Sequence, residues 1–130
     1  MSATGLHEDA ARLQAATIDE HRAYRSLMEE IEAVDGYAQR IDASADPQLK
    51  DVLRHNRDEE KEHAAMVLEW LRRRDPVLDR CLRRYLFTEG PLTAIEDAAE
   101  AGGDDGGAAL PGAEAPSGVG LGVGSLRAVR

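Results

Sequence analysis

Two long stretches of the chain repeat a pattern of mostly apolar residues at alternating steps of three and four, and a short polar break separates them. Such spacing places all the residues of the pattern on one face of an α-helix, a stripe called the seam below. A seam of this length has to pack against another helix, so the chain is expected to be all-α. The seam positions are Leu13, Ala16, Glu20, Ala23, Leu27, Glu30, Val34, Tyr37 and Ile41, then Leu49, Leu53, Asn56, Glu60, His63, Val67 and Trp70.

The break itself, DASADP at residues 42–47, predicts the turn between the two helices. It is rich in small and polar residues, and Asp46 followed by Pro47 is typical of an N-cap and the first turn of a new helix. The first helix is predicted from about Leu6 to about Gln39 and the second from Pro47 to about Arg74. Two long helices joined by a short connection form an antiparallel hairpin.

The chain after the hairpin divides into three parts. A shorter third helix is predicted in VLDRCLRRYLF, residues 77–87, and one or two weak turns in PLTAIEDAAEA. The glycine-rich composition that follows is typical of a flexible linker. We therefore predict a helical hairpin domain over residues 1–98, a Gly/Ala/Pro linker over residues 99–118 and a separate terminal peptide over residues 119–130.

Composition limits the classes of function that remain. The chain has 130 residues, a formal net charge of -9 and 4% aromatic residues, so its core is expected to be thin and the charge argues against nucleic acid or an anionic membrane as the main partner. No signal peptide and no membrane span is indicated. The single cysteine, Cys81, cannot form an intrachain disulfide, which fits a reducing cytosol, and we expect it to be packed and without a role.

Two glutamates and a histidine occupy seam positions that should be apolar. If the hairpin turns near residues 44 and 45, facing residues have numbers that sum to about 90, because both helices rise equally per residue. Glu30 then faces Glu60, and His63 lies one turn beyond Glu60 on the same face. The sequence thus predicts that these three ionisable groups meet in one layer of the seam.

A metal cation would explain that layer. Burying an unpaired carboxylate costs several kcal/mol and two adjacent carboxylates repel, whereas carboxylate oxygens and an imidazole nitrogen suit iron, manganese or zinc. One hairpin supplies half of the ligands of a di-iron carboxylate bundle, and two copies related by a two-fold axis supply all of them, with Glu60 able to bridge the metals. The alternative is a rung of salt bridges, because an E-x-x-H pattern alone is not specific.

Other ionisable residues are interpreted more simply. Glu29 and Glu32 are read as an exposed acidic face, with a weak hydrated cation site as the functional alternative. The remaining histidines, His7, His21 and His55, are expected at the surface or at the edge of the seam.

Three segments together resemble the encapsulated ferritins, the short ferritin-like cargo proteins of bacterial encapsulin compartments. They are SLMEEIEAVDGYAQRIDAS, HNRDEEKEHAAMVLEWLRR and YLFTEGPLTAIE, and the resemblance spans roughly residues 18–96. It implies a hairpin that dimerises into a ferritin-like four-helix bundle and assembles into an annular decamer. It also implies a ferroxidase, which oxidises iron(II) with dioxygen at a di-iron centre on the dimer interface.

The same resemblance assigns roles to individual residues. The metal ligands of the family fall on Glu30, Glu60 and His63, its active-site tyrosine falls on Tyr37, and the carboxylates through which metal enters fall on Glu29 and Glu32. One residue departs from the family pattern. Gly36 stands where the family commonly has a tryptophan, which removes a large aromatic side chain beside the site.

The last ten residues, LGVGSLRAVR, return apolar side chains after a long stretch with few of them. This composition favours a docking peptide, although an inert tail is the common alternative. Its V-G-S-L-R core resembles the cargo-loading peptides that bind the inner wall of encapsulin shells. The resemblance therefore implies a protein of the bacterial cytoplasm that lies inside an encapsulin nanocompartment, with the shell protein as partner of residues 121–130.

Three functions follow as hypotheses. The first is a ferroxidase that supplies ferric iron for storage in the larger shell. The second is a non-catalytic helical assembly module in which Glu30 and Glu60 form salt bridges. The third is a di-iron peroxidase.

Overall fold

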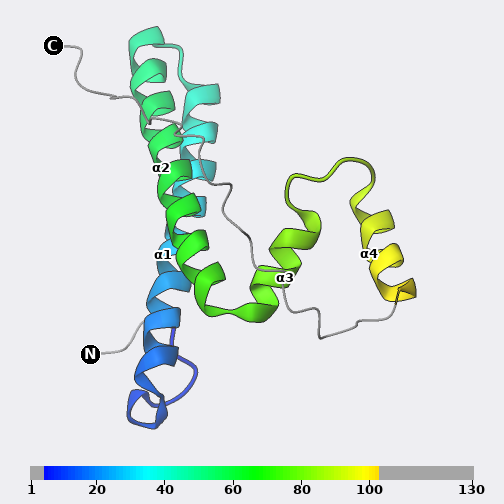
Figure 1. The fold of residues 1–130 in the computed structure, drawn as a ribbon. Helices are drawn as coiled ribbons and strands as arrows, with labels where there is room; N and C mark the ends of the chain where they lie inside the picture. The colour runs from blue at the N-terminus through cyan, green and yellow to red at the C-terminus, as the bar shows by residue number, and fades with distance from the viewer. Residues whose placement is uncertain (1–4, 103–130) are drawn as a thin grey trace, which may run out of the picture. The chain divides into compact units, whose positions relative to one another are not determined.

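The computed structural model describes residues 5–102, and within that range it contains helices and no strand. This confirms the expected all-α class. The chain divides into one unit that ends at Thr88 and a second that begins at Glu89, and each is described by itself. The predicted terminal peptide and most of the predicted linker lie outside the described residues. The elements are a 3-10 helix at Ala10–Arg12 and α-helices α1 at Ala15–Ala43, α2 at Pro47–Arg74, α3 at Pro76–Tyr85 and α4 at Leu92–Ala101 (Figure 1).

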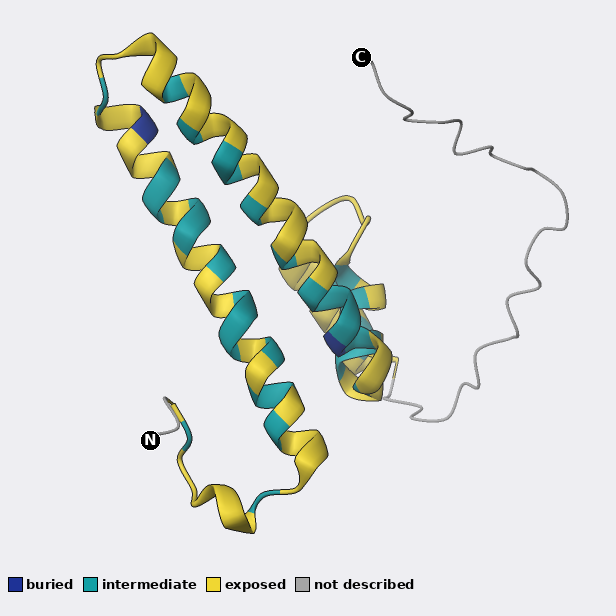
Figure 2. Ribbon diagram, turned by 90° about the vertical axis from the view of Figure 1, so that its left-hand side faces the viewer, coloured by how far each residue is buried: buried dark blue, intermediate teal, exposed yellow. Residues whose placement is uncertain are grey.

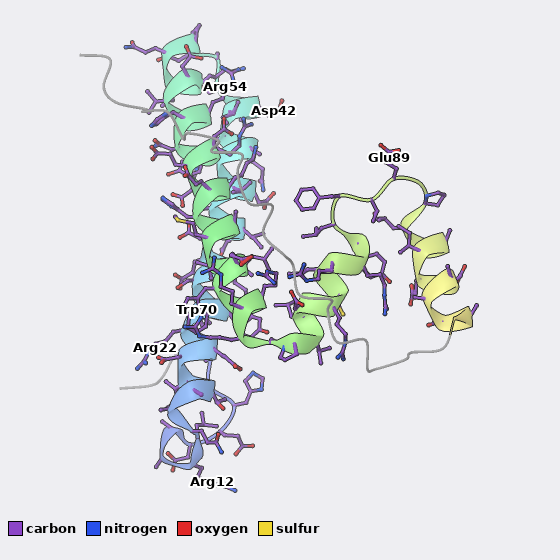
Figure 3. The ribbon with its side chains drawn as sticks, in the orientation of Figure 1. Arg12, Arg22, Asp42, Arg54, Trp70 and Glu89 are labelled. Carbon is purple, nitrogen blue, oxygen red and sulfur yellow. The ribbon has the colours of Figure 1, made fainter. Side chains whose placement is uncertain are left out.

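Helices α1 and α2 form the predicted antiparallel hairpin (Figure 1). The turn has the predicted chemistry, because the Asp46 carboxylate accepts hydrogen bonds from the backbone N–H groups of Gln48 at 3.0 Å and Leu49 at 3.4 Å, and Pro47 occupies the first turn. Figure 3 places Arg22 of α1 and Trp70 of α2 at a similar height along the hairpin. Their numbers sum to about 90, as the register derived from equal helical rise requires.

The predicted start of the first helix is wrong. Leu6 was expected to begin it, yet α1 begins only at Ala15. The Asp9 carboxylate accepts a hydrogen bond from the Ala11 N–H at 3.0 Å and so starts a short 3-10 turn, and the next residues, Leu13 and Gln14, have extended backbones. The local cap thus interrupts the helical pattern. At its other end α1 runs on to Ala43, beyond the expected Gln39.

The single chain buries very little. Among the described residues only Ile41 and Leu71 are buried, with exposed fractions of 9% and 1% (Figure 2). The expectation that Cys81 is packed is wrong, because Cys81 is exposed. Met28 and Met66 are also 50% and 58% exposed. The reason is geometric: each helix of a two-helix hairpin has one neighbour, so most of its circumference faces outward. None of the described helices is both long enough and apolar enough to cross a lipid bilayer.

Ion pairs fix the corner between α2 and α3. Asp75 ends α2 and caps α3, where its carboxylate accepts hydrogen bonds from the N–H groups of Val77 and Leu78. The Arg72 guanidinium on α2 pairs with Glu69 one turn earlier and reaches across to Asp79 on α3. Asp79 also pairs with Arg83 at 2.9 Å. The direction of α3 therefore depends on charge as well as on the burial of Leu71.

We expect this corner to weaken in acid. The hydrogen bonds from Arg72 lower the pKa of Glu69 to about 2, and Arg72 and Arg83 lower the pKa of Asp79. Because a depressed carboxylate pKa stabilises the fold above the pKa of the unfolded chain, the contribution of Glu69 is complete above about pH 5 and is lost as the pH falls toward 2. Urea unfolding of Glu69→Gln should show a smaller loss of stability over this range than unfolding of the wild-type chain. Equal losses would contradict the role of Glu69.

The third and fourth helices differ from their predicted lengths. Helix α3 ends at Tyr85, two residues before the predicted end, because the backbone of the next residue, Leu86, is extended. Phe87 follows with a left-handed backbone and a φ of 59°. Helix α4 has ten residues and is therefore longer than the one or two turns expected. Leu92 begins it and Gly102 follows it as the C-cap.

Candidate metal centre

The three residues that the seam argument selected meet in the folded hairpin. Glu30 comes from α1, and Glu60 and His63 come from successive turns of α2. One ligand atom of each lies within 4.8 Å of the other two. His63 Nδ1 is 3.2 Å from a carboxylate oxygen of Glu60 and 3.8 Å from one of Glu30. The cluster therefore joins the two helices across the seam.

Among the described residues, no strong cation balances these carboxylates. In the part of the chain that the structure describes, neither Glu30 nor Glu60 has an arginine or lysine within 4 Å, and their ion-pair partner is His63. Their side chains are 26% and 24% exposed, against 47% for His63. The two carboxylates are thus partly removed from water, and the imidazole stands at the more open side of the cluster.

The two carboxyl groups shift each other's pKa. A hydrogen bond with Glu60, with partial burial as the second cause, raises the pKa of the Glu30 carboxyl. The same hydrogen bond and a second one with His63 lower the pKa of the Glu60 carboxyl. The interaction therefore moves the two carboxyl pKa values apart, that of Glu30 upward and that of Glu60 downward. A divalent cation between them would favour the ionised form of both.

The donor set fits a metal ion of intermediate hardness. Two carboxylate oxygens and one imidazole nitrogen are a donor set that suits iron, manganese or zinc. Glu30, Glu60 and His63 could therefore hold a metal ion together.

Other residues singled out in the sequence lie elsewhere. Glu29 and Glu32 are exposed on α1 and do not join the cluster, which is compatible with either interpretation given for them. His55 is exposed and pairs with Glu59 at 3.0 Å, and His7 is also exposed. His21 is half-buried on α1 and has an interaction of its own, in agreement with its expected place at the edge of the seam.

An arginine that the sequence analysis did not consider lies beside Tyr37. Tyr37 is half-buried on α1, and the guanidinium carbon of Arg40 stands 5.4 Å from the centre of its ring. A side chain at Gly36 would begin 3.8 Å from the same guanidinium. A Cβ at this position would thus make an ordinary van der Waals contact with the Arg40 side chain. Its position three residues after Tyr37 on a helix was the only sequence signal.

The fold and the cluster define a class of protein: an all-α, ferritin-like hairpin with a carboxylate and histidine cluster in its seam. Comparison with known families is more specific. Residues 5–89 match the EncFtn-like family, and the chain belongs to this family.

Similar proteins agree with that assignment. An encapsulated ferritin-like protein of Rhodospirillum rubrum is 57% identical over 126 residues, which cover 97% of this chain and 90% of the relative. A ferritin-like protein of Thermotoga maritima is 49% identical over 80% of this chain and 91% of its own length. The crystal structure of protein ne0167 from Nitrosomonas europaea matches with a TM-score of 0.66 and 57% identity, and covers 67% of this chain and 96% of that one.

Proposed function

We propose that the protein is a ferroxidase, which oxidises iron(II) to iron(III) with dioxygen. The observation that carries the proposal is the Glu30, Glu60 and His63 cluster, whose ligand atoms converge within 4.8 Å, with no arginine or lysine of residues 5–102 to neutralise them. Iron is the substrate, and its chemistry at the site is the loss of one electron per ion to oxygen. The chain's own residues bind the iron and hold it in place.

The complete site belongs to two chains. One hairpin offers two carboxylates and one imidazole, which are too few for two iron ions, whereas two hairpins related by a two-fold axis offer twice that set. Glu60, which interacts with both Glu30 and His63, is proposed as the ligand that the two iron ions would share. Tyr37 is proposed as the tyrosine of the active site, and Glu29 and Glu32 as exposed carboxylates through which iron reaches the cluster.

The product is proposed to be stored in a larger compartment. An encapsulin cargo protein, EncC of Myxococcus xanthus, is 39% identical to this chain over 103 residues, and the Rhodospirillum rubrum relative is called encapsulated. These names support an encapsulin shell as the partner and its interior as the location in the bacterial cytoplasm. A ring of hairpins, such as the annular decamer, encloses no large mineral cavity of its own, so the shell would hold the iron.

Aerobic addition of iron(II) tests the activity directly. Anaerobic iron(II) is mixed with the metal-free protein and air-saturated buffer, and the absorbance of ferric species is followed. The protein should raise the initial rate above that of buffer and of a net-negative protein without such a cluster. A rate equal to both controls would overturn the proposal.

Metal should also strengthen the pairing of chains. Because the carboxylates of two chains would approach one another, a divalent cation relieves their repulsion and stabilises the paired state by mass action, by about 2.7 kcal/mol when free metal is ~100 times its Kd. Light scattering with and without a redox-inert divalent ion measures the effect. His63→Ala is the control and should show little response. Association that is equally strong with and without the divalent ion would count against a shared site.

One observation supports the assembly module as a second candidate. Protonated His63 would form ion pairs with Glu60 at 3.2 Å and with Glu30 at 3.8 Å, and the pair with Glu30 alone could join α2 to α1. In that case the cluster is structural and iron oxidation is not accelerated.

No comparable observation favours the peroxidase. If the protein were a peroxidase, iron oxidation in the same assay would be faster with hydrogen peroxide than with dioxygen.

A further inference from the structure

Asn56 is a polar residue in the seam of α2 that lies outside the metal cluster. It is half-buried, and its amide makes no hydrogen bond to any other residue in the range 5–102. Its polar atoms keep some access to water. A polar group that is partly removed from water without a protein partner costs free energy, so an apolar residue would stabilise the seam more.

A role in fixing the register of the hairpin does not explain this residue. A polar seam residue fixes the register of two helices when it hydrogen-bonds a polar group on the other helix. Facing positions in the hairpin sum to about 90, so the residue opposite Asn56 is Val34. Valine has no side-chain donor or acceptor, and the amide therefore has no partner across the seam of its own chain.

The cluster residue nearest to Asn56 along α2 is Glu60, four positions later. Side chains at this spacing are neighbours on one face of a helix, with Cβ atoms about 5 to 6 Å apart. Helical side chains also lean toward the N-terminus of their helix, which for Glu60 is the direction of Asn56. A change of side-chain rotamer alone can therefore bring the amide and the carboxylate into hydrogen-bond distance.

Metal binding would remove one hydrogen bond that Glu60 now makes. In the metal-free cluster, hydrogen bonds with Glu30 and His63 lower the pKa of the Glu60 carboxyl. A hydrogen bond between two carboxyl groups requires a proton on one of them, whereas carboxylates that bind a metal are ionised. The hydrogen bond between Glu30 and Glu60 is therefore lost when both bind a metal ion.

Asn56 is the donor placed to replace it. The other donor at helical spacing before Glu60 is Arg57, which is already paired with Asp58 at 3.0 Å. A carboxylate that binds a metal is commonly hydrogen-bonded by a further residue that holds it in place. An amide N–H can do so without adding a positive charge, which would repel the metal ion.

We propose that Asn56 is a positioning residue of the metal site, whose side-chain amide donates to the Glu60 carboxylate when the cluster holds a divalent metal ion. This role rests on the proposed function only in so far as the cluster binds metal, because oxidation of iron is not part of it. Asn56 thus lowers the stability of the metal-free seam and contributes to the metal-bound state.

The affinity of the full chain for zinc(II), a redox-inert ion, tests this role. Asn56→Leu removes the donor and keeps a side chain of similar size. In competition with a metal-binding dye, it should raise the zinc Kd about tenfold, as expected when a residue that supports a ligand is lost. Light scattering establishes that all the chains are compared in the same state of association.

Leu53→Val is the matched control for a change in the seam. Leu53 is half-buried on the same face of α2, but it lies seven residues before Glu60, about 10 Å along the helix axis, and has no polar group. Its zinc Kd should stay within about twofold of the wild type, because well-separated sites act nearly independently.

Urea unfolding with a chelator present gives a second readout, which a merely structural role would move in the opposite direction. Asn56→Leu should raise the urea midpoint of the metal-free chain, since an apolar side chain replaces an amide without a protein partner. Leu53→Val should lower the midpoint, because it removes a methylene group from the seam. A structural asparagine would instead give Asn56→Leu a lower midpoint and an unchanged zinc Kd.

The two proposals fail in different ways. If the wild type binds zinc and Asn56→Leu binds it with a Kd less than about threefold higher, the role of Asn56 is overturned and the proposed function stands. If the wild type binds no zinc, both are overturned. Asn56→Ala needs no more space than the native side chain and decides the same comparison if Asn56→Leu does not fold.

Discussion

Replacing Glu60 or His63 by alanine should abolish most of the iron oxidation while the hairpin remains folded. Each of these residues lies in the cluster of three potential ligands, and His63 contacts both carboxylates. Loss of an outer residue around a metal typically costs 10 to 100-fold, so loss of a ligand should lower the initial rate by about 100-fold or more. The measurement is the initial rise in ferric absorbance after aerobic addition of iron(II).

Glu59→Ala is the matched control for this experiment. Glu59 is adjacent to Glu60 in sequence, but it is exposed and pairs with His55 rather than with the cluster. Its rate should stay within about twofold of the wild type, because surface substitutions seldom change energies by more than ±0.5 kcal/mol. Wild-type rates in both Glu60→Ala and His63→Ala would refute the assignment of the metal site.

Deletion of residues 121–130 should prevent packaging and leave iron oxidation intact. The segment joins Leu121, Val123 and Leu126 with glycines that let an extended peptide approach a surface closely, and Arg127 could contact an acidic rim. Each peptide is expected to bind weakly, and many copies on one oligomer raise the effective concentration and hold the cargo by avidity. The measurement is the amount of cargo in compartments purified after co-expression with the shell protein.

A second variant separates peptide chemistry from chain length. Leu126→Ser keeps all 130 residues but removes one apolar contact, so it should reduce loading and leave the rate of iron oxidation unchanged. A deletion within the preceding linker, residues 103–110, is the control for length and should load normally. If the chain that lacks residues 121–130 is packaged as fully as the wild type, the targeting role is excluded.

Much of the hairpin could be predicted because its determinants are local. The step pattern fixed which face of each helix carries the seam, and Asp46 with Pro47 fixed where α2 begins. The start of α1 could not be predicted in this way. Leu13 and Ala16 continue the helical pattern, yet the cap at Asp9 and the extended residues after it defer the helix to Ala15. Two local preferences competed there, and periodicity does not show which one is stronger.

The candidate metal layer could also be derived, because it needs only helical rise and a turn of known position. Equal rise in two antiparallel helices brings residue 30 opposite residue 60, and a spacing of three adds residue 63. Three further properties of this layer depend on side-chain packing and could not be derived. The first is how far these residues are exposed, and the second is the hydrogen bond that raises the pKa of Glu30. The third is that, within residues 5–102, no arginine or lysine lies close to either carboxylate.

The sequence by itself thus determined an all-α hairpin, its turn and the three residues that meet in the seam, since these follow from regular spacing along single helices. Only the tertiary structure decided the corner between α2 and α3. Arg72 and Asp79 are seven residues apart with a helix break between them, and their pairing depends on the angle at Asp75 and Pro76. The direction in which α3 leaves α2 follows from that angle, which no periodic pattern encodes.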